Sequence, residues 1–514
     1  MAFVAAAAFV LWLGLRLFAH APVHVVTVST PEGSLPFLYC DATALALVPC
    51  LWVWRQQPPS ERTARGCVAA AALCAALTYG SHGLGRYYRG DALAWDLANF
   101  LQPLWRALSG QGMTSTWHEG KPLWGDHGSF AFFLYAPLTR IFDDAATGPL
   151  LAQAALSAAF VPACYALARQ LGLGTTQALA AACVAMASRP LFYASTFDFH
   201  PECALPLLLA LLLIAHARGS FAACAAAALI AASLKDMAAL TAFGTCAYLA
   251  GRDRSAKLAA LACAVLGVAL FDMFALPGLT GWGSYVSMNS SAPVDAGLAL
   301  ETTLMRALST GLVGSLHPLG MLAGAPWTLA AAISPKLLVK GVQFQYGFFF
   351  VSSALLGAIC AAAWAQRRWP RGALDLMLTW ALVSVTLNAA RALDLRKASA
   401  ARTTYELVRA DLRQLADARE PIATDACSAA YVMERPVLLP LCQIDLERFA
   451  QSGEERWDRP DERALQGALI LLQPSCPLHG SCLAQQLERA RRLGYESVGA
   501  RRGYMALRAP ASPP

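Results

Sequence analysis

Residues 197–215 read FDFHPECALPLLLALLLIA, in which Asp198, His200 and Glu202 stand directly before an apolar run. Such a run is typical of a helix entering a hydrocarbon core. The rest of the chain agrees, because 57% of its 514 residues are hydrophobic and only 14% are charged. Soluble domains are roughly 25% charged, so this chain lacks the polar surface to cover its core. With a mean hydropathy of +0.45, we expect a polytopic membrane protein.

The apolar runs predict about thirteen transmembrane helices, each crossing a core that takes roughly 20 residues. They are 2–18, 35–54, 67–79, 149–168, 178–193, 203–215, 221–234, 237–249, 258–276, 303–316, 319–333, 348–365 and 373–390. We expect the runs 303–316 and 319–333 to form a tight helical hairpin that turns at His317-Pro318. Segment 129–142 is short and holds Pro137 and Arg140, so we expect it to be re-entrant or interfacial. The first run lacks the positive start of a signal peptide, which favours an uncleaved helix.

The basic residues predict the orientation. Arg and Lys gather in short loops at 55–65, 169, 218, 252–257 and 367–371. Basic loops stay inside, so we expect the N-terminus in the cytoplasm and the C-terminus outside the cytoplasmic (inner) membrane. The net charge of +7 is spread over these loops, which argues against a nucleic-acid-binding surface. The preference for Arg over Lys, with abundant Ala, indicates a GC-rich bacterial genome.

The chain changes character after residue 393. Residues 1–393 form the predicted transmembrane domain, with a long outer loop at 81–128. Residues 394–514 show helical patterns at 399–416 and 483–493 and short apolar runs at 421–424, 436–440 and 468–473. These alternating patterns predict a small extracytoplasmic α/β domain. Its cysteines are Cys427, Cys442, Cys476 and Cys482. Either Cys476 and Cys482 close a disulfide loop, or all four are buried thiols.

The outer loop carries the first candidate site. It contains Asp91 and then WDLANFLQPLW at 95–105, in which Asp96, Asn99 and Gln102 recur every third residue. This spacing places the three polar groups along one helical face. The face is either part of a binding site or the polar side of a surface helix without chemistry.

Asp126 and His127 form a second candidate, directly before the short apolar segment. They are either a helix cap, in which Asp126 accepts backbone N–H groups, or residues of a metal or phosphate site.

The densest candidate is the opening stretch. Asp198, His200 and Glu202 are two residues apart, so an extended turn would place all three on one side. Two carboxylates and an imidazole suit a divalent ion or proton transfer. Arg189 precedes them. Ionisable groups at membrane depth are costly, which favours a function over a solvated turn.

Further charged residues lie where the predicted topology does not favour charge. Lys235-Asp236 lies between two spans, where an ion pair persists only if it is paired or functional. Lys336 and Lys340 fall outside, against the positive-inside tendency. They either bind an anionic ligand near the membrane surface or extend to the interface as ordinary lysines do. The chain contains no P-loop, nucleophile elbow or zinc-protease motif.

Together these pieces carry a resemblance. WDLANFLQPLW, DHGSFAFFLYAPL, FDFHPECALPLLL, SLKDMAAL, APWTLAAAISP and QYGFF follow one another in the order of the chain. Between Arg86 and Tyr346 the sequence resembles the predicted membrane proteins of domain-of-unknown-function family 2079. Ala98 stands where that family usually has Gly. Lys235-Asp236 lacks the middle Glu of Lys-Glu-Asp, and Gln345-Tyr346 replaces His-Tyr.

The resemblance implies a fold and a function. The family is grouped with the GT-C glycosyltransferases, polytopic enzymes that take a sugar from a polyprenyl-phosphate carrier outside the membrane. It implies an acid of the first outer loop as catalytic base or metal ligand, best matched by Asp96 and second by Asp91. The implied catalytic residues also include Asp198 and His200, with Asp96 and His200 as ligands of a divalent cation such as Mg²⁺ or Mn²⁺. The implied substrate-binding residues are Asn99, Gln102, Asp126, His127, Arg189, Glu202, Lys235, Asp236, Lys336 and Tyr346.

The expected reaction is inverting sugar transfer in the cell envelope. Asp96 deprotonates an acceptor hydroxyl, while Arg189, Lys235 and Lys336 or a divalent ion stabilise the departing phosphate. Two alternatives stay open. A transporter or flippase of lipid-linked or anionic solutes would line its path with Lys235, Asp272 and His200. A non-catalytic membrane assembly protein would use the outer domain to bind a partner.

Overall fold

The structure is a computed structural model that describes most of the chain. The described residues are 54–89, 97–116, 120–281, 312–333, 347–388, 405–407, 409–411, 414, 420–425, 428–435, 437–444, 457–458, 465, 468–473, 482–501 and 504–509. Statements below about the fold concern these residues. The predicted spans 2–18 and 35–54, and most of 303–316, lie outside them.

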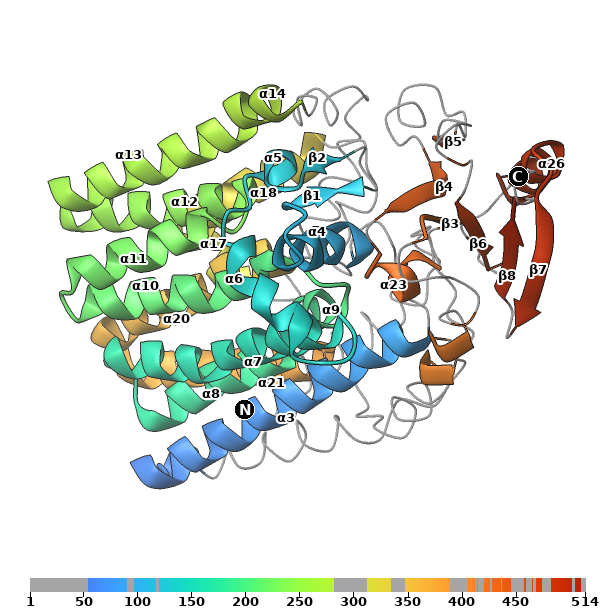
Figure 1. Cartoon of the computed structure of the whole chain (residues 1–514). Coiled ribbons are helices and arrows are strands. Elements are labelled where there is room, and N and C mark those ends of the chain that lie inside the picture. Colours follow the sequence, from blue (N-terminus) through green and yellow to red (C-terminus); the bar gives the residue numbers. More distant parts are fainter. Residues whose placement is uncertain are drawn as a thin grey trace.

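Long apolar helices run side by side and form a bundle (Figure 1). They are α3 (Glu61–Arg89), α7 (Thr147–Gln170), α8 (Thr175–Ala187), α10 (Leu205–Ala217), α11 (Phe221–Ala232), α12 (Asp236–Asp253), α13 (Ala256–Leu270), α17 (Leu312–Leu316), α18 (Pro318–Ile333), α20 (Gly347–Arg368) and α21 (Pro370–Asn388). Ala and Leu favour these helices. Ser220 and Ser255 cap α11 and α13, because each side-chain hydroxyl accepts the backbone N–H of the residue three positions later.

Four of the described helices are long and apolar enough to cross a membrane, at 61–88, 147–170, 256–280 and 347–368. A fifth span is obtained if α8 and α9 (Arg189–Thr196), bent by 49°, count as one. Helices α10 and α11 are apolar but shorter. The predicted number of about thirteen crossings therefore stays a prediction. Helix α3 continues through Arg89, so its last turns overlap the predicted outer loop 81–128. We call the part of that loop after α3 the outer segment.

Three glycines explain the turn at His317-Pro318. A Cβ on Gly320 would lie 1.9 Å from the carbonyl oxygen of Gly314, so the chain doubles back between α17 and α18. A Cβ on Gly357 of α20 would lie 2.4 Å from the same oxygen. Backbones approach this closely in helix bundles only where side chains are absent.

Short elements cover one end of the bundle (Figure 1). They are α4 (Asn99–Leu108), β1 (Thr114–Ser115), β2 (Lys121–Pro122), α5 (Trp124–His127), α6 (Phe132–Tyr135) and the 3₁₀ helix η3 (Ala136–Arg140). The 3₁₀ helix η4 (Pro201–Ala204), the π-helical turn η5 (Phe271–Ala275) and α14 (Leu276–Thr280) complete this end. Segment 129–142 thus breaks into pieces of four and five residues, too short to cross a bilayer. It exposes Phe133, Leu134 and Ile141, as an interfacial segment would.

The C-terminal residues build a small sheet domain at the same end (Figure 1). Its elements are β3 (Ile422–Asp425), α23 (Ala429–Val432), β4 (Leu438–Ile444), β5 (Trp457–Asp458), β6 (Leu469–Leu472), α26 (Cys482–Arg492), β7 (Glu496–Arg501) and β8 (Tyr504–Arg508). The strand order is β5-β4-β3-β6-β8-β7, with β3 parallel to β4 and β6 and the other pairs antiparallel. The predicted runs match β3, β4, β6 and α26. The side chains of the four C-terminal cysteines lie outside the described residues, so their pairing stays a prediction.

Candidate functional site

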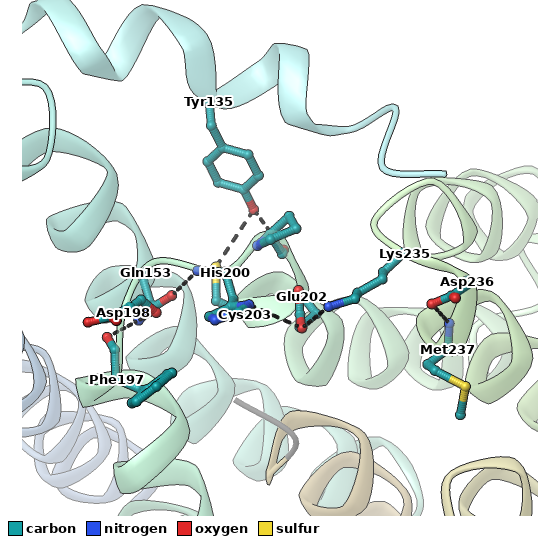
Figure 2. A network of polar contacts seen from close by, with 11 residues as sticks. Tyr135, Gln153, Phe197, Asp198, His200, Glu202, Cys203, Lys235, Asp236 and Met237 are labelled. Carbon is teal, nitrogen blue, oxygen red and sulfur yellow. Dashed lines mark hydrogen bonds and ion pairs between the residues drawn. The ribbon is translucent and has the colours of Figure 1, made fainter. Parts of the chain in front are cut away.

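One glutamine of α7 fixes the FDFHP turn (Figure 2). The side-chain nitrogen of Gln153 donates to the carbonyl oxygens of Ser195, Phe197 and Asp198 at 3.3, 3.1 and 3.3 Å. Its side-chain oxygen accepts the backbone N–H of His200 at 2.8 Å. Buried backbone groups without a partner are costly, so one side chain satisfies the turn between α9 and η4.

His200, Glu202 and Lys235 form a buried charged cluster (Figure 2). Oε1 of Glu202 lies 3.5 Å from Nδ1 of His200 and 3.2 Å from Nζ of Lys235. Their side chains are 1%, 0% and 7% exposed, respectively. Charges this deep persist when they are paired, and the pairing of Glu202 with Lys235 was not among the expectations from the sequence.

Asp198 points to a different partner. Its Oδ1 lies 3.6 Å from Nη2 of Arg86, at the end of α3, and the Arg86 guanidinium stacks 4.8 Å from the centre of the Phe197 ring. The expectation that one extended turn places all three ionisable groups on one side is therefore not met. The backbone is extended at His200 but enters a 3₁₀ turn at Pro201, which rotates Glu202 toward Lys235.

Aromatic side chains join the outer elements to this turn. Phe100 of α4 contacts the His200 ring edge-on, with ring centres 5.0 Å apart. Phe132 of α6 packs against both Phe100 and Phe199. The hydroxyl of Tyr135 donates to the carbonyl oxygen of Pro201 at 3.2 Å. The segment after residue 96 and the FDFHP turn therefore meet.

The polar face of α4 is buried and bonded to protein. The amide nitrogen of Gln102 donates to Oγ1 of Thr116 at 2.7 Å and to the carbonyl oxygen of Arg435 at 3.3 Å. Asn99 accepts from Ser115 at 3.5 Å. Thr116 also donates to the carbonyl oxygen of Leu438 in β4 at 3.0 Å. Gln102 thus links the outer segment to the C-terminal domain, a role that differs from the predicted contact with substrate.

A second cluster of polar side chains lies beside the end of α3. Tyr87 hydrogen-bonds to Tyr405, Arg409 pairs with Glu434, and Asp144 accepts from Thr147. Burial, together with the Asp144 carboxylate, raises the pKa of the Tyr405 hydroxyl well above its ordinary value, so it stays protonated. A cavity of about 460 Å³ opens here, lined among others by Tyr88, Thr147, Tyr405 and Arg409.

Several predicted site residues lie outside the described structure. These are Asp91, Asp96, Lys336 and Tyr346, together with the side chains of Asp126, His127 and Arg189. Asp236 is described and accepts the backbone N–H of Met237 at 2.6 Å. Within the described residues, no three His, Cys, Asp or Glu side chains converge in a way that would hold a metal ion. The Asp96–His200 metal site therefore stays a prediction.

Sequence reasoning missed Gln153, Arg86 and Tyr135. Gln153 had a usable signal, since it stands as a lone amide in the apolar run LLAQAAL of α7, where polar groups are expensive. Arg86 and Tyr135 had none, because their partners lie 112 and 66 residues away along the chain.

Comparison with known proteins places this geometry in context. No curated protein matches the chain. Among solved structures, ArnT from Cupriavidus metallidurans bound to undecaprenyl phosphate matches with a TM-score of 0.52 and 13% identity, over 87% of this chain and 98% of that one. Apo ArnT matches with a TM-score of 0.51 and 12% identity over the same shares. At this identity the likeness shows the fold.

The family match is more extensive. The model of the family described as predicted membrane protein DUF2079 matches residues 88–411, which include the FDFHP turn, the Lys235-Asp236 pair and the apolar helices that follow. The resemblance of the sequence pieces is thereby confirmed, and the chain belongs to the DUF2079 family of multi-pass membrane proteins.

Proposed function

We propose that the protein is an integral membrane glycosyltransferase that takes a sugar from a polyprenyl-phosphate donor at the outer face of the cytoplasmic membrane. The observation that carries this is the buried cluster of His200, Glu202 and Lys235 at the covered end of an ArnT-like bundle, with Asp198 of the same FDFHP turn paired to Arg86. The undecaprenyl phosphate bound to ArnT and the GT-C resemblance of the motifs support a lipid phosphate as part of the donor.

The proposed reaction is an inverting displacement at the anomeric carbon. The carboxylate of Asp96 takes the proton of the acceptor hydroxyl as the acceptor oxygen bonds to that carbon. The bond between the anomeric carbon and the phosphate oxygen breaks, and polyprenyl phosphate leaves as an anion. Lys235, Arg189 and Lys336 stabilise its charge. Mg²⁺ or Mn²⁺, where bound, adds Lewis-acid stabilisation of the same phosphate.

The buried cluster favours transfer over transport. Glu202 holds Lys235 and His200 in one place at the end of the bundle, and the Phe100 and Phe132 rings cover it. Fixed charges under a cover of outer segments suit the positioning of a reacting group. A transport path would instead run polar groups through the middle of the bundle.

Native mass spectrometry of the detergent-purified protein tests the donor class. We expect a co-purifying polyprenyl-phosphate lipid, lost in Lys235→Met and retained in Asp253→Asn, whose side chain lies at the other end of α12. For the chemistry, Asp96→Asn should abolish transfer of sugar from purified lipid donor in vesicles while insertion and thermal midpoint stay at wild-type values. Full transfer by Asp96→Asn would remove Asp96 from the mechanism. Wild-type protein that binds no polyprenyl phosphate would overturn the proposal.

A further inference from the structure

Asp272 is a buried carboxylate that the reaction above does not use. It lies in the π-helical turn η5 that follows α13, and it is 2% exposed. Neither of its carboxylate oxygens has a hydrogen-bond partner in the described structure. π-helical turns inside α-helices occur frequently at functional sites. An ionised carboxylate buried without a partner is strongly unfavourable, so something absent from the protein chain alone balances it.

The outer segment closes directly over Asp272. Gly128 has a φ of +61°, and a Cβ built on it would lie 2.2 Å from Cγ of Asp272. The next residue, Ser129, is 2% exposed, and its hydroxyl also has no partner in the described structure. Helix α5, which ends at His127, packs against α14 and η5 at the covered end of the bundle (Figure 1). A second buried side chain with an unsatisfied oxygen therefore follows directly after the glycine that contacts Asp272.

A second carboxylate belongs to the same region. Asp236 begins α12, and its like charge acts on Asp272. The segment before it is tied to the outer segment, because the N–H of Ala131 donates to the carbonyl oxygen of Ser233 at 2.9 Å. Two carboxylates held together repel each other unless a proton or a cation lies between them.

We propose that Asp272 and Asp236, with the hydroxyl of Ser129, bind a divalent metal ion of the Mg²⁺ or Mn²⁺ type. The donors are all oxygen atoms, which hard cations prefer. Fewer than three acidic, His or Cys side chains converge here among the described residues, and this suits Mg²⁺. That ion usually takes one or two carboxylates and fills its other positions with water and substrate phosphate. The site is distinct from the pair Asp96 and His200 predicted from the sequence.

The position gives the ion a role that rests on the proposed function. Asp236 follows Lys235, whose Nζ pairs with Glu202, so the ion and the buried cluster share one segment of chain. An ion held by Asp272 would meet a lipid phosphate from the side of η5, while Lys235 meets it from the side of the FDFHP turn. The ion site itself depends only on the buried oxygens described above.

Equilibrium binding of Mn²⁺ to the full-length protein in detergent, followed by electron paramagnetic resonance, tests the proposal. We expect one ion per chain, displaced by excess Mg²⁺. Asp272→Asn and Asp236→Asn should each weaken binding by roughly 10- to 100-fold or more. Asp253→Asn is the matched control, because Asp253 ends the same helix α12 at the opposite end of the bundle, and it should bind like the wild type.

A thermal measurement keeps the test independent of variant folding. Mn²⁺ should raise the unfolding midpoint of the wild type and of Asp253→Asn but not of Asp272→Asn. Without Mn²⁺, Asp272→Asn should be at least as stable as the wild type, because the substitution removes an unpaired buried charge. Wild-type protein that binds no Mn²⁺, or Asp272→Asn that binds it unchanged, overturns the site. Protein that binds Mn²⁺ but no undecaprenyl phosphate upholds the site and overturns the proposed function.

Discussion

The two ends of the helix bundle use charge in opposite ways. At the end that joins α7 to α8 and α12 to α13, ion pairs are open to solvent, as in Arg65 with Glu61, whose side chains are 74% and 39% exposed. Asp253 there pairs with His216 and Arg252 on the surface. At the covered end, Glu202, His200 and Lys235 are buried. Exposed pairs contribute little to stability, whereas removing one member of a buried pair is costly. The first set lies loosely on the surface, and the second is fixed inside the fold.

Breaking the buried pair should have the largest effect. Glu202→Leu removes the carboxylate that pairs with the buried Lys235, and we expect a loss of about 3–5 kcal/mol in unfolding free energy. Asp253→Leu at the opposite end should leave the unfolding midpoint near the wild-type value. The measurement is thermal unfolding in detergent, followed by intrinsic fluorescence. Adding Lys235→Met to Glu202→Leu should recover most of the loss. A Glu202 variant as stable as the Asp253 variant would erase the contrast between the two ends.

The next largest loss of stability is expected where the uncharged side chain of Gln153, in α7, holds the FDFHP turn. Gln153→Leu removes four hydrogen bonds to the FDFHP turn, each leaving a buried backbone group short of a partner. The two hydrogens of the amide nitrogen are shared among three carbonyls, so the equivalent of three hydrogen bonds is lost. At a net contribution of about 1 kcal/mol for each bond, we expect a loss on the order of 3 kcal/mol. Gln170→Leu, at the exposed end of the same α7, is the matched control. Hydrogen–deuterium exchange at residues 195–202 should rise in Gln153→Leu alone, and equal exchange in both variants would show that another group holds the turn.

The smallest expected difference is between alanine substitutions at two glycines that both have a positive φ. Gly128 and Gly172 have φ values of +61° and +87°, but only Gly128 has a side chain within 4 Å of an added Cβ. In both variants the alanine must adopt the left-handed backbone conformation, which lowers the unfolding free energy by roughly 1–2 kcal/mol. Gly128→Ala should lose about 1–3 kcal/mol more, because its methyl group displaces Asp272. Thermal midpoints measure the difference, and identical midpoints would mean that Asp272 moves aside freely.

The sequence predicted the parts of this molecule that depend on local pattern. The apolar helices, the helical face of Asn99 and Gln102 and strands β3, β4 and β6 all follow from residue periodicity. Partners were harder to predict. The burial of Asn99 and Gln102 against residues 115, 116 and 435 depends on contacts across the fold. Strands β7 and β8 were missed because their sequences, ESVGAR and YMALR, do not show a sustained apolar alternation.

The rotation of Glu202 away from Asp198 shows why spacing alone was insufficient. A separation of two places residues on one side only while the backbone stays extended, and Pro201 ends that conformation. The proline was visible in the sequence as a helix start. Its consequence for the direction of Glu202 depended on Lys235, which arrives from another helix.

The link between α4 and β4 sets an order of assembly. Gln102 and Thr116 bond to Arg435 and Leu438, which lie 333 and 322 residues later in the chain. During synthesis, residues 99–116 are made long before the strand that completes them. The α4 segment must therefore wait for its partners at residues 435 and 438 until most of the chain has been made. Contacts of such long range form late. A chain truncated before residue 430 would insert its helices yet leave its outer site unfinished, which makes the last domain the final step of maturation.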